Sequence, residues 1–599
     1  MKKLQGHVSL IIAVIATLAA MIATGLSGDY FFDLNDDVLI KDILSGAYTG
    51  APEGHNIQML YPISLFISLF YRLGVNIDWY GIFLCGLQYL CFGVVVFKSV
   101  ELTEDVRKKA VVALAEFVFI MGFFMPHLLF VQYTVVCGVL SATAAFLIIT
   151  ADEKSIENSL ALVFIIVAFL LRSEMLLLTL PMVGVAILIK FLCVSKETGN
   201  INSSLGKYTI FCIVIIGALL IGTFLNNLAY SSPEWKEFNR FFDNRTELYD
   251  FQFIPDYAEN REFYESIGLS ESQQKLLTNY NFGLDDSINA DVLAKVAEYA
   301  KSIKGEEAPF FVRLKDSVKQ YIYRLHHVET LRTYEYPMTD FPWNILVLIL
   351  YPAVLVVSML ADESTGSRRT RLGRILFFLI TLFACRTALW LFIIIRGRDP
   401  IRITHPLYLV EILILLGMLL NEERHGKKAS EVAALVAMAV MLVIGVFALP
   451  MQLNITKKEQ LLRSEMLANY GKLEEYVRNH DDSFFFYDVY TSVSYASVAE
   501  GEVATYSEKL FENVDNSCYN RDILGGWASK SPLAIKKLKD AGFDNASEAL
   551  LEPGSYFVQN KTESVDWLVD FYVEKGMDVR IIQKDTVADI FGIYSISEN

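Results

Sequence analysis

Long apolar runs separated by short polar segments dominate the chain. Two shorter apolar runs, 158–171 and 175–193, meet at Arg172-Ser173-Glu174 and predict a helical hairpin with its apex outside the membrane. The pattern predicts an α-helical polytopic membrane protein with about eleven transmembrane helices. The other nine runs are each long enough to cross a hydrocarbon core of about 30 Å, and lie near residues 8–27, 78–98, 109–125, 128–150, 207–228, 343–361, 374–395, 403–420 and 430–450.

The stretch from Met59 to Leu73 is apolar but too short to be an ordinary span. It contains Pro62 and ends in Tyr71-Arg72. A short apolar segment of this kind is typical of a re-entrant or interfacial helix. We therefore expect it to lie at the membrane surface, beside the first outer loop.

Two long polar stretches divide the chain into four parts. Residues 1–228 form an N-terminal transmembrane module whose first outer loop is 28–77, and 229–341 form a large, mainly helical loop. Residues 342–450 form the C-terminal transmembrane helices. Residues 451–599 read as a soluble α/β domain, because strand-like patterns alternate with helical ones. The strand-like segments are 483–490, 554–559, 578–583 and 589–596, and the helical segments are 533–541 and 565–575.

The basic residues of the short loops predict the orientation. Under the predicted spans, Lys2, Lys3 and the clusters 107–109 and 368–374 all fall on one side, which the positive-inside bias assigns to the cytoplasm. The N-terminus is then cytoplasmic. The first outer loop, 229–341 and the C-terminal α/β domain are extracytoplasmic.

Composition supports this class and excludes others. Of the 599 residues 53% are hydrophobic, and the mean hydropathy is +0.38, which is too apolar for a soluble protein of this length. The net charge of −16 comes with no basic face for nucleic acid. Six of the seven cysteines lie in apolar runs, so no disulfide framework or zinc spacing is available.

Five aspartates lie between residues 28 and 42, directly after the first apolar run, and Asp36 and Asp37 are adjacent. Two ionised carboxylates this close repel each other, so either one has a raised pKa or a metal or cationic substrate lies between them. Both arrangements suit a general base. The alternative is that Asp33 or Asn35 caps a short helix, with Asp36 and Asp37 in its first turn.

Arginines on the predicted outer side provide a second signal. Arg396, Arg398 and Arg402 share one short outer loop, against the positive-inside bias, and Arg172 lies at the hairpin apex. Guanidinium groups bind phosphate oxygens in pairs, so an anionic group outside would explain them. Lipid-headgroup contacts, or salt bridges to Glu174 and Asp399, are the alternative. Deeper in the spans, Arg386 and Glu411 come to similar depth and predict a structural ion pair.

An acidic pair facing an anion-binding patch is what sugar transfer from a lipid-phosphate donor requires. At these residues the chain resembles the GT-C superfamily of polytopic glycosyltransferases, in a layout similar to protein mannosyltransferases and aminoarabinose transferases. Asp36-Asp37 matches the acidic motif of their first outer loop, and 55–71 resembles their His/Pro segment. The step 171–181 is similar to their Arg-containing half-helix, and 402–408 to their Arg-x-x-x-Pro entry to a late span.

The resemblance implies an inverting transfer of a sugar from a polyprenyl-phosphate donor to an extracytoplasmic glycan, lipid or protein. By it, Asp36 is the catalytic base, and Asp37 is its partner or a ligand of a divalent metal such as Mg or Mn. Arg172 and Arg402 bind phosphate. The expected substrate-binding residues are His55, Arg172, Glu174, Arg396, Arg398, Arg402 and His405.

Three other functions use parts of the same pattern. A transporter or flippase for lipid-linked saccharides would bind phosphate through the same arginines without chemistry. An O-antigen-type polymerase has many spans and a large outer loop, but relies on arginines there and not on an acidic pair. A non-catalytic membrane scaffold that displays the C-terminal domain is the third.

Overall fold

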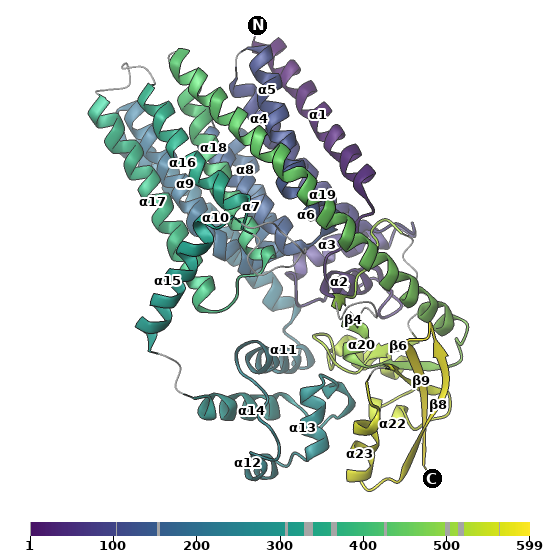
Figure 1. Cartoon of the computed structure of the whole chain (residues 1–599). Coiled ribbons are helices and arrows are strands. Elements are labelled where there is room, and N and C mark those ends of the chain that lie inside the picture. The colour runs from purple at the N-terminus through teal and green to yellow at the C-terminus, as the bar shows by residue number, and fades with distance from the viewer. Residues whose placement is uncertain are drawn as a thin grey trace.

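Long helices form one end of the molecule, and short helices and a sheet form the other (Figure 1). The structure is a computed structural model. It describes residues 2–103, 105–151, 156–305, 309–328, 340–360, 368–424, 428–496, 503–512, 520–561 and 563–598.

Within these residues, ten helices are long and apolar enough to cross a membrane. An eleventh helix, α8, has 16 residues and meets α9 at Arg172, which confirms the predicted hairpin. The chain is therefore a multi-pass helical membrane protein, as predicted. The helices of this layer are α1 (Lys2–Ser27), α4 (Trp79–Leu102), α5 (Val106–Phe119) with η1 (Ile120–Phe124) and α6 (Met125–Leu129), α7 (Tyr133–Thr150), α8 (Ile156–Leu171), α9 (Ser173–Thr198), α10 (Ile201–Ala229), α16 (Trp343–Leu360), α17 (Arg368–Ile395), α18 (Ile401–Arg424) and α19 (Lys428–Arg478).

Two of these helices form the centre of the bundle. Every residue of α7 is buried, and 94% of the apolar window of α18 is buried. Both are apolar all round, as expected of helices enclosed by others. By contrast, α1 and α10 are 22% and 17% buried and present apolar side chains outward, as lipid-facing helices do.

The first outer loop is fixed against the bundle by a short parallel strand pair. β1 (Phe31–Phe32) pairs with β2 (Phe130–Val131), and α2 (Asn35–Ser45) and α3 (Tyr61–Tyr71) follow. The residue before α2 is Leu34, whose side chain makes no capping hydrogen bond, so the alternative of a cap by Asp33 or Asn35 is wrong. Asp36 and Asp37 do lie in the first turn. α3 is the short apolar helix expected of the stretch after Met59.

The segment between α10 and α16 is mainly helical where it is described. Charged and aromatic residues are frequent along it. The helices α11 to α14 pack as a small group next to the sheet, whereas α15 lies against α17 of the bundle (Figure 1). Its elements are α11 (Pro233–Thr246), η2 (Glu247–Phe251), α12 (Arg261–Ser266), α13 (Glu271–Thr278), η3 (Phe282–Leu284), α14 (Ala290–Ile303) and α15 (Phe310–His326).

The C-terminal domain is built around a five-stranded sheet with the order β6-β3-β7-β9-β8. β3 pairs in parallel with β6 and β7, whereas β9 is antiparallel to β7 and β8. The predicted α/β fold is confirmed. Its elements are β3 (Phe484–Tyr487), α20 (Val489–Val493), β4 (Ser494–Ala496), β5 (Val503–Thr505), β6 (Arg521–Ile523), α21 (Pro532–Asp540), α22 (Ala546–Ala549), β7 (Ser555–Asn560), α23 (Asp566–Glu574), β8 (Val579–Val587) and β9 (Phe591–Glu598).

The boundary expected at 450/451 lies inside α19. This helix runs without a break from the bundle to the sheet domain, although it contains Pro450. The length of an apolar run predicts where a helix leaves the hydrocarbon region. It does not predict where the helix itself ends, because the helix can continue through polar residues.

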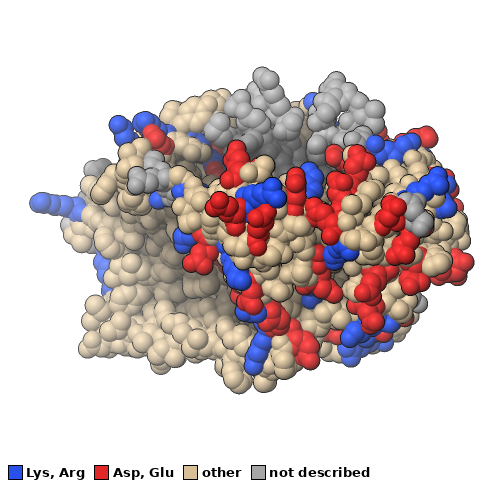
Figure 2. All heavy atoms as spheres, turned by 90° about the horizontal axis from the view of Figure 1, so that it is seen from below, with Lys and Arg blue, Asp and Glu red and all other residues tan. Residues whose placement is uncertain are grey.

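The sheet domain contacts the α11–α15 segment. The side-chain amide of Asn281 donates to Asp488 Oδ1 at 2.7 Å, and the backbone N–H of Gly283 donates to the Leu524 carbonyl at 2.8 Å. Figure 2 views this end of the molecule, where acidic and basic side chains gather on one half of the face and leave the other largely uncharged. The loop with α2, the α11–α15 segment and the sheet domain thus meet at one end of the bundle.

Candidate active site

Asp36 lies in the first turn of α2, half-buried, on a support that fixes the start of this helix. The β1–β2 pair holds Phe31 and Phe32 directly before it. Arg463 of α19 adds a buried ion pair to Asp33 at 3.1 Å and donates to the carbonyls of Phe32 and Asp33 at 2.8 and 3.0 Å. The carboxylate of Asp36 is therefore presented from a rigid element.

Three guanidinium groups lie close enough to act electrostatically on the carboxylate. Burial raises the pKa of Asp36 above its ordinary value, and the positive charges of Arg402, Arg172 and Arg245 offset part of that rise. They come from α18, from the α8–α9 junction and from α11. None of them forms a direct ion pair with Asp36.

Two of these arginines have no carboxylate partner among the described residues. Arg402 and Arg245 are both half-buried, and no hydrogen bond or ion pair satisfies either of them there. Arg245 is held by aromatic rings instead: its guanidinium lies 5.7 Å from the ring of Tyr249 and 5.5 Å from that of Tyr280. An unpaired, partly desolvated guanidinium is costly to a protein and is typical of an anion-binding site.

Arg172 is more constrained. Its guanidinium donates to Gln58 Oε1 at 2.9 Å, pairs with Glu174 at 3.2 Å and lies over the ring of Tyr133. The alternative interpretation, a salt bridge to Glu174, is thus correct for this arginine. Arg172 still contributes its charge to the surroundings of Asp36.

Asp37 has a different environment from its neighbour. It is fully buried and accepts hydrogen bonds from the Tyr80 hydroxyl at 2.9 Å and from the Tyr133 backbone N–H at 3.3 Å. Burial raises its pKa well above the ordinary value; the Tyr80 hydroxyl lowers it and the nearby Asp36 charge raises it further. Its Oδ2 atom has no hydrogen-bond partner. Asp37 therefore ties α2 to the bundle and leaves one oxygen uncommitted.

No cluster of three or more His, Cys, Asp or Glu side chains that could hold a metal occurs in the described parts of the chain. The acidic pair offers two carboxylates at most. A divalent metal there would have to complete its ligands from substrate and water.

His55 belongs to a different cluster. Its Nδ1 lies 2.7 Å from Glu53 Oε1 and its Nε2 lies 3.3 Å from the Ala229 carbonyl, while its ring stacks on Trp235. Both ring nitrogens are thus occupied where α10 meets α11. The structure does not bring His55 into contact with Asp36 in the part that it describes.

The three arginines of the predicted outer loop have different surroundings. Arg396 is exposed over the ring of Phe392, and Arg398 pairs with Asp250 at 2.6 Å, so only Arg402 faces Asp36. Asp399 pairs with Arg324 of α15, not with its own loop.

Deeper in the bundle, three residues singled out from the sequence, His405, Arg386 and Glu411, have partners within the protein. His405 Nδ1 lies 2.7 Å from His127 Nε2, and its ring stacks on Trp343. The predicted ion pair between Arg386 and Glu411 is confirmed, with Nε and Oε2 2.7 Å apart.

The sequence reading missed Arg245 and Trp527. Trp527 comes from the sheet domain, its indole lies beside the Asp36 carboxyl, and its buried Nε1 makes no hydrogen bond of ordinary geometry. The two glycines directly before Trp527 are the sequence feature that could have indicated its close contact with another segment. A Cβ on Gly525 would lie 1.8 Å from the Tyr280 carbonyl oxygen, and Gly526 has φ +83°, so the backbone approaches the α11–α15 segment closely here. No comparable sequence feature lies next to Arg245.

Fold and site together define a polytopic membrane protein in which a carboxylate at the end of the helix bundle lies within the electrostatic reach of three arginines. No family model matches the chain, and no curated protein matches it. Two solved structures of ArnT from Cupriavidus metallidurans are similar along 97% of both chains. The apo form has a TM-score of 0.39 and 9% identity, and the form bound to undecaprenyl phosphate has a TM-score of 0.37 and 10% identity.

Proposed function

We propose that this protein is a membrane glycosyltransferase. It moves a sugar from a polyprenyl-phosphate donor to an extracytoplasmic acceptor, which is a glycan, a lipid or a protein. The observation that carries the proposal is the position of Asp36 near two half-buried arginines, Arg402 and Arg245, that have no carboxylate partner among the described residues. Undecaprenyl phosphate, bound in one of the similar structures, is a polyprenyl phosphate of the kind that this transfer would release.

The arginines bind the donor phosphate. Arg402 and Arg245 offer planar pairs of N–H donors from opposite elements, and phosphate oxygens accept such pairs. Arg172, already fixed by Gln58 and Glu174, adds positive charge without moving. Charge placed in this way stabilises the phosphate most when it leaves with its full negative charge.

Asp36 activates the acceptor. Its carboxylate takes the proton of an acceptor hydroxyl as that oxygen bonds to the anomeric carbon. The bond between this carbon and the phosphate oxygen breaks on the opposite face, and polyprenyl phosphate leaves with the bonding electrons. Attack from the face opposite the phosphate inverts the anomeric configuration. The raised pKa of Asp36 makes it a stronger base than an exposed aspartate.

Asp37 positions this base. Its hydrogen bonds to Tyr80 and to the Tyr133 backbone hold the first turn of α2. If a divalent cation takes part, Asp36 and the free Oδ2 of Asp37 would hold it beside the donor phosphate.

A reconstitution experiment distinguishes transfer of the sugar from transport of the intact donor. The purified protein is reconstituted in vesicles with a radiolabelled polyprenyl-phosphate sugar and a mixture of glycan acceptors, with and without chelator. The proposal expects release of polyprenyl phosphate and a labelled product from wild type, and neither from Asp36→Asn. Movement of intact donor across the bilayer by both forms, without release of polyprenyl phosphate, would establish a transporter instead.

A further inference from the structure

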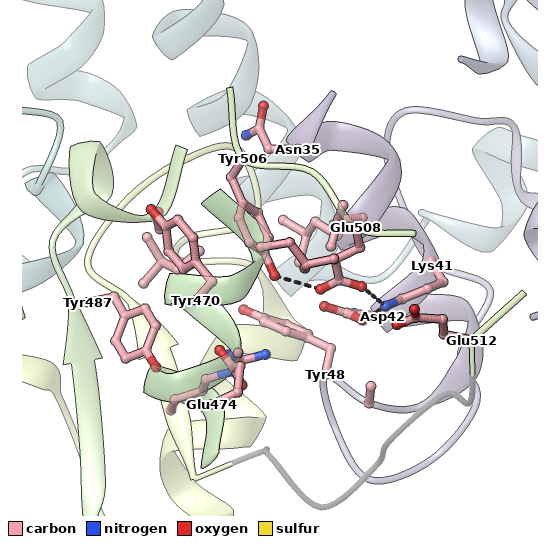
Figure 3. A pocket seen from close by; sticks show the side chains of 18 of the residues that line it. Asn35, Lys41, Asp42, Tyr48, Tyr470, Glu474, Tyr487, Tyr506, Glu508 and Glu512 are labelled. Atoms are coloured by element: carbon pink, nitrogen blue, oxygen red, sulfur yellow. Dashed lines mark hydrogen bonds and ion pairs between the residues drawn. The ribbon is translucent and has the colours of Figure 1, made fainter. Parts of the chain in front are cut away.

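A cavity lies against α2, the helix that carries Asp36. It has a volume of about 310 Å³ and is enclosed by α2, the continuation of α19 past the bundle, and the sheet domain (Figure 3). Five α2 residues line it, and four of them lie on one face of the helix: Asn35, Val38, Leu39 and Asp42, with Lys41 beside them. Asp36 lies about 100° further round the same helix from Asn35. The cavity and the base therefore share one element.

Several charged groups of this cavity pair with one another. Lys41 pairs with Asp42 at 3.0 Å and with Glu508, which also accepts a hydrogen bond of 2.7 Å from the Tyr506 hydroxyl. Across the cavity, Arg521 pairs with Glu474. Figure 3 shows Asp42, Glu474 and Glu508 among the side chains that line the cavity from α2, α19 and the sheet domain.

Tyrosine rings complete the lining. Tyr48 follows α2 and donates to Asp522 Oδ1 at 3.4 Å, while the ammonium of Lys537 lies 4.4 Å from its ring. The rings of Tyr506 and Tyr470 lie on the opposite wall, 4.7 Å apart between centroids. The cavity thus combines flat aromatic surfaces with a dense set of hydrogen-bond donors and acceptors.

This lining selects one ligand class. A simple anion or cation would have to break internal ion pairs, and a lipid chain would bury charged groups against hydrocarbon, at a high cost in free energy. An uncharged ligand with many hydroxyls avoids both penalties. Its hydroxyls donate to carboxylates and accept from ammonium and guanidinium groups, while its C–H faces pack on aromatic rings. The volume is within the usual range for small-ligand sites.

We propose that this cavity binds a saccharide, the sugar part of the acceptor in the proposed transfer. Only the role of this saccharide as acceptor rests on the proposed function. Saccharide binding by the cavity can be measured independently of transfer. A saccharide held against the Asn35 face of α2 extends toward Asp36 on the adjoining face. The acceptor is then a glycan or a glycolipid, not an unmodified protein.

The test is saturation-transfer-difference NMR of the full-length protein with methyl glycosides of glucose, galactose, mannose and N-acetylglucosamine. The detergent must have no sugar headgroup. We expect wild type to bind at least one of these glycosides. Asp42→Asn and Glu474→Gln each remove the charge from one acceptor and should weaken binding about tenfold, the effect of losing one hydrogen bond to a charged group. Glu237→Gln, on the exposed face of α11, is the matched control and should bind as wild type does.

Absence of binding for every glycoside, or equal binding by wild type and both cavity variants, would overturn the proposal. Undecaprenyl phosphate binding, measured on the same samples, keeps the two proposals apart. Asp42→Asn should retain it if both are correct. Glycoside binding at the cavity by a protein with no affinity for undecaprenyl phosphate would leave the saccharide site standing and refute the proposed transferase.

Discussion

Asp36 and Asp37 are adjacent in sequence, yet their surroundings assign them to different tasks. Successive residues on a helix point about 100° apart, so Asp36 faces the arginines while Asp37 faces the bundle and binds Tyr80. An acidic pair was visible in the sequence. The different roles of the two residues could not be predicted from the sequence, because they depend on which side of α2 packs against which helix.

The first prediction at this scale concerns pH. Asp36 acts only when ionised, and burial raises its pKa, so transfer should fall as the pH drops through that raised value, above the usual range for aspartate. Arg402→Gln removes the positive charge that lowers this pKa most, so the acid limb of the kcat–pH profile should move to higher pH. Arg396→Gln, in the same loop but exposed over Phe392, is the control. An unchanged limb in Arg402→Gln would contradict the assignment of Asp36 as base.

The second prediction concerns Arg245. Arg245→Gln should weaken binding of undecaprenyl phosphate about tenfold, because a charged hydrogen bond contributes about 1.5–3 kcal/mol. The measurement is the Kd of the purified protein for this lipid. Arg240→Gln lies on the same helix, in an exposed pair with Asp291, and should bind as wild type does. Equal affinity in both variants would remove Arg245 from the site.

At the scale of elements, the position of α2 depends on contacts far away in the chain. Arg463 of α19 binds Asp33 and two carbonyls of the β1 region, and the β1–β2 pair joins this region to the start of α7. The base is therefore held by two membrane helices at once.

Arg463→Met should destabilise the protein more than any substitution of an exposed arginine. Loss of one partner from a buried ion pair costs about 3–5 kcal/mol, and both side chains of this pair are less than 5% exposed. The measurement is the Tm of the purified protein in detergent, with Arg240→Met as the matched control. A Tm for Arg463→Met equal to that of the control would show that this contact does not secure α2.

Sequence patterns predicted the elements better than their ends and contacts. Apolar runs located the spans, and alternation located strands such as 555–560, because both depend on local periodicity. The continuation of α19 to Arg478 was missed because its polar turns resemble any surface helix. Arg402 was found because three arginines broke a charge rule. Arg245 and the saccharide cavity depend on segments more than 200 residues apart meeting in space, which no local pattern encodes.

At the scale of the whole molecule, the number of crossings decides which side the soluble segments occupy. The N-terminus and the sheet domain lie at opposite ends of the bundle (Figure 1). Opposite ends require an odd number of crossings, so α8 must cross together with the ten longer helices. Its 16 residues extend about 24 Å, somewhat less than the usual core thickness of about 30 Å, so the bilayer must thin locally or α8 must be shielded by its neighbours.

Labelling tests the predicted orientation. In a background with Cys518→Ser, a membrane-impermeant maleimide added to intact cells should label Asp540→Cys, at the exposed end of α21, and should not label Arg107→Cys, near the start of α5. The reason is that the positive-inside bias assigns the N-terminal side to the cytoplasm. Labelling of Arg107→Cys alone would invert the topology and place the candidate site in the cytoplasm.

The central claim is that Asp36 acts as a base on an acceptor while arginines hold the donor phosphate. The most direct measurement is the single-turnover rate of sugar transfer with donor already bound, for wild type and Asp36→Asn, alongside the Kd of each for undecaprenyl phosphate. Loss of a general base should slow transfer about a hundredfold or more, with donor affinity retained. Equal single-turnover rates for the two proteins would contradict this claim, because another residue would then have to act as the base.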